Sequence, residues 1–149
     1  MSGARAVWVR GGLVFFTLVF AVLGAYILIS PEGFFGWAWV NLGMAYNPHL
    51  MLDYGAMNLA AAIPLGAAAA TMNPVFVRSA LASFAVWAVA HLLIHVRLRS
   101  HLVAHASIDQ ANLLLCLLTV GAVVPLVLLL LTFGGRAEAQ RRERMRAVD

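Results

Sequence analysis

The stretch Asn47-Pro48-His49-Leu50-Met51-Leu52-Asp53-Tyr54-Gly55 marks the start of a long apolar helix and places two ionisable side chains in its first turns. Asn47 is a typical N-cap and Pro48 is favoured at the first helical position, so we expect a helix over residues 48–72. His49 and Asp53 are four residues apart and therefore share one helix face, with Asp53 about 6 Å further along the axis. This helix begins with a polar pair on an otherwise apolar element.

The composition around this stretch is that of a membrane protein. The 149 residues are 63% hydrophobic and 11% charged, with a mean hydropathy of +0.90, which is more apolar than a water-soluble domain. The net charge of +4 does not indicate nucleic-acid binding, because half of the ten arginines lie in residues 136–149, where membrane topology explains them. Cys116 is the only cysteine, so an intrachain disulfide is excluded.

Four apolar segments are long enough to cross a bilayer, which takes about 20 residues. They cover residues 11–29, 48–72, 74–97 and 108–133, and the last begins with a capping box of Ser107 and Gln110. The aromatic segment 33–46 is expected to lie at the membrane interface. The sequence therefore predicts an all-α, four-helix transmembrane bundle over residues 1–135, with a short interfacial aromatic segment between helices 1 and 2, followed by a basic cytoplasmic tail over residues 136–149.

The arginines also predict the orientation. Arg5, Arg10, Arg78 and the arginines of the tail belong to one side of the membrane, and only Arg97 and Arg99 to the other. By the positive-inside rule the first side is cytoplasmic, so both termini are expected in the cytoplasm of a bacterial inner membrane. Every histidine then lies toward the extracytoplasmic side.

The second and third spans carry the main candidate site. A tight turn joins them, so we expect antiparallel neighbours that bring Asp53 level with His91, and His49 level with His95. Three imidazoles and a carboxylate can hold a zinc, iron or copper ion. Haem ligation, an organic ligand or a proton path, and hydrogen bonding that only joins the helices remain alternatives. An ionisable group inside a span costs about 2.5–3.5 kcal/mol, which favours a function.

The fourth span adds a polar stripe, because Asp109, Asn112, Cys116 and Thr119 recur at helical spacing. Asp109 has the right depth to join the candidate site. His105 would share a face with His91 and His95 if the third helix continued, although a solvated loop is the simpler prediction. We expect polar contacts between helices from Asn58, Asn112, Cys116 and Thr119.

The motifs Asn47-x-His49-x-x-x-Asp53-x-Gly55-Ala56 and His91-x-x-x-His95, in a four-span chain, resemble small actinobacterial membrane proteins that are loosely DoxX-like. This resemblance implies a membrane redox context involving quinones or thiols, and the single cysteine argues against thiols. No nucleophile or phosphate-binding motif assigns a reaction. The alternative function is a non-enzymatic subunit or assembly partner, or a homo-oligomer, in which the histidines and Asp53 only join helices.

Overall fold

The computed structural model describes residues 3–134, and within this range the chain forms helices without a strand. The helices are α1 (Gly3–Ile29), α2 (Pro31–Phe35), α3 (Ala38–Asn41), α4 (Pro48–Thr71), α5 (Pro74–Arg97), α6 (Arg99–His105) and α7 (Ile108–Leu131). Four of them, α1, α4, α5 and α7, are long and apolar enough to cross a membrane. The predicted all-α four-helix bundle is confirmed, and the chain is a multi-pass membrane protein. The predicted tail over residues 136–149 lies outside the described range.

The helix starts follow the capping residues. The side-chain oxygen of Asn47 accepts a hydrogen bond from the Leu50 amide at 3.1 Å, and Asn73 caps α5 in the same way. Ser107 and Gln110 form the predicted reciprocal capping box at the start of α7. The first helix begins at Gly3, earlier than the predicted residue 11, because a helix can continue beyond the apolar run that spans the bilayer.

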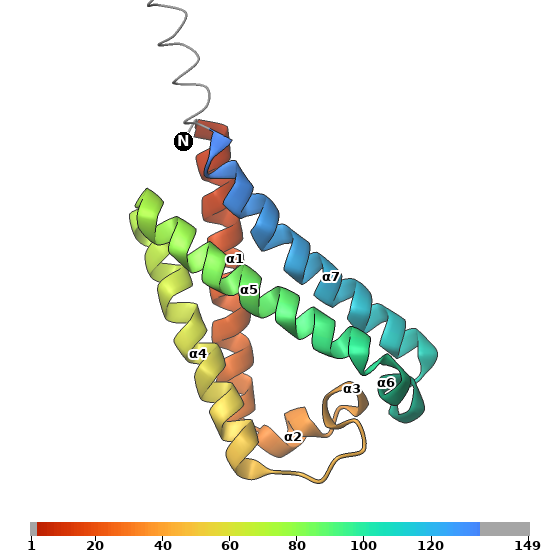
Figure 1. Ribbon diagram of the computed structural model, residues 1–149. Coiled ribbons are helices and arrows are strands. Elements are labelled where there is room, and N and C mark those ends of the chain that lie inside the picture. The colour runs from red at the N-terminus through yellow and green to blue at the C-terminus, as the bar shows by residue number, and fades with distance from the viewer. Residues whose placement is uncertain (1–2, 135–149) are drawn as a thin grey trace, which may run out of the picture.

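The four long helices form two pairs, α1 with α4 and α5 with α7 (Figure 1). Glycine allows the close approach within the first pair: a Cβ atom on Gly24 would lie 2.8 Å from both the Gly55 carbonyl oxygen and the Leu59 amide nitrogen. In the second pair, the Arg78 guanidinium donates to the Thr132 hydroxyl at 3.2 Å and to the Thr132 carbonyl at 2.8 Å. These two hydrogen bonds join the start of α5 to the end of α7.

The two pairs meet near the α4–α5 turn and diverge toward the opposite end, so the bundle has the shape of a wedge (Figure 1). The common core lies where the pairs meet and includes Phe16 and Phe20 of α1 packed on Phe84 of α5. The short helices α2 and α3 lie at the open end. Phe34 of α2 packs against α1 and α4, and Leu42 after α3 packs against α6 and α7. The aromatic segment therefore bridges the two pairs.

The divergence corrects one expectation. The helices α4 and α5 are antiparallel and joined by a tight turn, as predicted, but they do not remain neighbours along their whole length (Figure 1). The small-residue face of α4 packs on α1 instead. The segment 100–108, expected to be a loop, also contains most of α6.

Candidate functional site

His49 and Asp53 form a pair within α4 at the open end of the wedge. The imidazole Nε2 lies 3.3 Å from a carboxylate oxygen of Asp53, and the two side chains are 86% and 61% exposed. A pair of this kind stabilises a helix by about 0.2–0.5 kcal/mol. Neither residue lines the cavity described below, so this pair belongs to the outer surface of α4.

His91 and His95 continue a row of stacked rings along one face of α5. The rings of Phe84 and Trp87 stack with centroids 6.0 Å apart, and those of Trp87 and His91 stack at 5.0 Å with an interplanar angle of 9°. The His95 ring meets the His91 ring edge-on at 4.8 Å. The spacings of three, four and four residues keep all four rings on one helix face.

This row ends in a cavity of about 430 Å³ between the two helix pairs. Pockets of this size hold small organic ligands. The side chains around it come from all the described helices except α6, and no charged residue of the described chain is among them. They are Leu23, Phe34, Trp37, Trp39, Val40, Leu50, Met51, Tyr54, His91, His95, Leu114 and Leu117.

One polar atom of a side chain that lines the cavity has no hydrogen-bond partner within residues 3–134. The Nδ1 atom of His95 is buried and makes no hydrogen bond there. Leaving a buried polar atom unpaired costs about 1–3 kcal/mol. A neutral imidazole offers one donor and one acceptor nitrogen, so His95 can bind a ligand atom of either kind.

The structure does not bring together the predicted four-residue metal site of His49, Asp53, His91 and His95. Among residues 3–134, no group of three or more histidine, cysteine, aspartate or glutamate side chains is placed to hold a metal ion. The physical reason is the divergence of α4 from α5. On α4, the apolar faces of Leu50, Met51 and Tyr54 line the cavity where the polar pair was expected.

The secondary candidates also lie outside the cavity. Asp109 is exposed in the first turn of α7. His105 is exposed as well, and its Nδ1 atom donates to the His101 carbonyl at 3.0 Å. His101 in turn donates from Nε2 to the Leu42 carbonyl at 2.8 Å, which fastens the aromatic segment to α6. The helix breaks at Leu98, so His105 does not continue the row of His91 and His95.

The four residues that were predicted to make polar contacts between helices differ in their surroundings. Asn112 of α7 accepts a hydrogen bond from Arg99 of α6 at 3.2 Å. Asn58 and Thr119 instead donate to backbone carbonyls of their own helices, those of Tyr54 and Leu115, both at 2.7 Å. Cys116 is an exposed free thiol.

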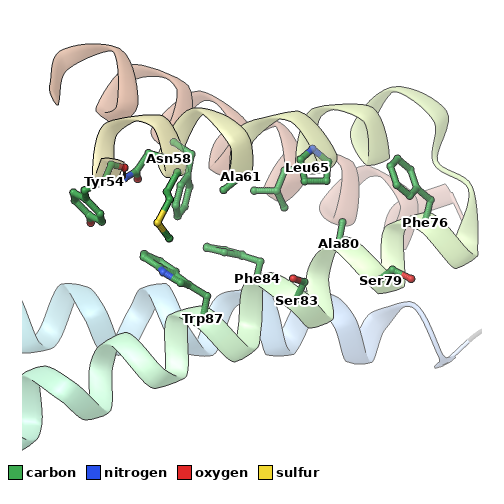
Figure 2. Close-up of a pocket in the computed structure, with 13 residues that line it drawn as sticks. Tyr54, Asn58, Ala61, Leu65, Phe76, Ser79, Ala80, Ser83, Phe84 and Trp87 are labelled. Carbon is green, nitrogen blue, oxygen red and sulfur yellow. Dashed lines mark hydrogen bonds between the residues drawn. The ribbon is translucent and has the colours of Figure 1, made fainter. Parts of the chain in front are cut away.

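A second hollow, a groove of about 360 Å³, separates α4 from α5 (Figure 2). Ala61 and Leu65 line it from α4, and Ser83, Phe84 and Trp87 line it from α5. We call it the α4–α5 groove. Neither the groove nor the role of Trp87 was predicted from the sequence, although the four-residue spacing from Trp87 to His91 indicates that the two rings share a helix face.

Tyr54 contributes to both the groove and the cavity. Its position on α4 faces the row of rings on α5. The groove and the cavity therefore follow each other along the space between the two helices.

No family model, curated protein or solved structure matches this chain.

Proposed function

We propose that this membrane protein binds an uncharged, planar amphiphile of the quinone class, with the ring in the cavity beside His91 and His95. The observation that carries the proposal is the unpaired Nδ1 atom of His95, whose side chain helps to line a cavity formed mostly by aromatic and aliphatic side chains. Such a cavity, with few polar groups, is typical of a site for a small apolar ligand.

The chemistry of the lining favours this ligand class. A quinone carries two carbonyl acceptors on a flat ring, and its reduced form carries hydroxyl donors in the same places. An imidazole can donate to the first and accept from the second. Trp37, Trp39 and Tyr54 offer aromatic surfaces for a ring. The absence of charged side chains from the cavity, within the described residues, suits a neutral ligand.

The loose DoxX-like resemblance of the sequence is consistent with a quinone and a membrane redox context. A metal ion is the weaker proposal, because the described histidine and acidic side chains form no ligand group for one. We assign binding and no catalytic step.

The arginine distribution supports an orientation with both termini in the cytoplasm of a bacterial inner membrane, and the cavity toward the opposite side. In a Cys116→Ala background, a single cysteine at Ser100 should react with an impermeant maleimide added to intact cells, and one at Ser2 should not. The reverse labelling would contradict this orientation.

Ligand binding can be tested with menadione, a naphthoquinone ring without a tail. We expect detergent-solubilised protein to bind it, and the His95→Leu variant to bind it about two- to tenfold more weakly, because one hydrogen bond contributes about 0.5–1.5 kcal/mol. His49→Leu is the matched control, since His49 is exposed and lies outside the cavity. Isothermal titration calorimetry measures both affinities.

The alternative function as an assembly partner predicts a different result. A protein whose histidines only join helices would not bind menadione, and His95→Leu would change only stability. Equal weakening by His95→Leu and His49→Leu would also contradict the proposed site.

A further inference from the structure

We infer that the natural ligand is a long-chain amphiphile whose hydrocarbon tail lies in the α4–α5 groove and which enters sideways from the bilayer. This inference rests on the proposed function, because the tail belongs to the ligand whose ring occupies the cavity. It adds a second binding region, a long tail on the ligand and a route of entry from the bilayer.

The groove adjoins the cavity. Tyr54 of α4 lines both. On the opposite side, Trp87 lines the groove and stacks on His91, which lines the cavity. A molecule with its ring beside His91 therefore has the groove next to its binding site.

Small side chains make the groove deep enough for a chain. Ala61 on α4 and Ser79, Ala80 and Ser83 on α5 lie along it, where larger residues would fill the space (Figure 2). No charged side chain of the described residues lines it. A groove of about 360 Å³ without a charged side chain among the described residues has room for an uncharged hydrocarbon chain inside a membrane.

The groove opens on the surface that faces lipid. Met57 and Phe76, which line it, are 60% and 39% exposed, and both belong to helices that span the membrane. Ser79 and Ser83 are exposed as well. A tail can thus pass from the bilayer into the groove between α4 and α5 without crossing the protein core.

Menaquinone-4, which carries the menadione ring with an isoprenoid tail, tests this inference. We expect Ser83→Trp to weaken its binding by about tenfold, because a large side chain placed in occupied space costs affinity. Menadione should bind Ser83→Trp and the wild type equally, which also shows that the variant is folded. Each ligand is compared between proteins in the same detergent, so its partition into micelles cancels.

The matched control is Val86→Trp, at a position of α5 that is 72% exposed and lies outside the groove. It should leave both affinities unchanged. If wild-type protein binds menadione but Ser83→Trp leaves menaquinone-4 binding intact, or if Val86→Trp weakens it as much, the tail lies elsewhere and the inference is wrong. If wild-type protein binds neither compound, the proposed function itself fails.

Discussion

Two pairs of side chains with the same four-residue spacing have different surroundings in this protein. His49 and Asp53 contact each other on the exposed surface of α4, whereas His91 and His95 line the cavity. Spacing alone predicts that the members of each pair share a helix face. It does not predict which face meets another helix, because that depends on residues far away in the chain.

Because the His49–Asp53 pair lies apart from the His91–His95 pair, substitutions in the two should act independently on stability. Asp53→Asn and His91→Gln should change the free energy of unfolding independently, because the two residues share no contact. We expect the double variant to equal the sum of the single variants within about 0.5 kcal/mol. Thermal or denaturant unfolding of the four proteins in one detergent measures this. A coupling well above that value would mean that Asp53 and His91 are partners.

For the helices, the capping hydrogen bonds could be predicted from the sequence, but which helices pack against each other could not. The caps at Asn47, Asn73 and Ser107 act on amides within three residues, so the sequence shows them directly. The pairing of α1 with α4 depends on Gly24 meeting Gly55, which lie on different helices. A stripe of small residues indicated that α4 packs closely, but it did not name the partner helix.

The close contact of Gly24 with α4 predicts that a larger residue at this position destabilises the fold. Gly24→Ala should lower the free energy of unfolding by about 1–3 kcal/mol, because the new methyl group would meet backbone atoms of α4 that cannot move aside. Gly11→Ala in the same helix is the control, since a Cβ atom there has no neighbour within 4 Å. It should be neutral or stabilise by up to about 1 kcal/mol. Equal destabilisation by both changes would contradict the α1–α4 packing.

For the whole molecule, hydropathy predicted the four spans, since length and composition suffice for that. The wedge and its cavity were not predictable from the sequence. The tight turn shows that α4 and α5 are antiparallel, but it does not show whether they stay in contact along their full length. The aromatic segment was expected at the interface, and the structure also uses it to line the cavity with Phe34, Trp37 and Trp39. Of the four residues predicted for the candidate site, His91 and His95 line the cavity. Aromatic side chains that were not predicted there line it with them.

The proposed site places a ligand ring beside His91 and His95 and beside no other histidine. The chain has five histidines, and the other three, His49, His101 and His105, are exposed and lie outside the cavity, so they serve as internal controls. The most direct measurement is the nuclear magnetic resonance spectrum of ¹⁵N-histidine-labelled protein in detergent, with and without menadione. We predict that the ring-nitrogen signals of His91 and His95 shift and that the other three remain in place. Shifts confined to the exposed histidines, or no shift at all, would contradict the claim.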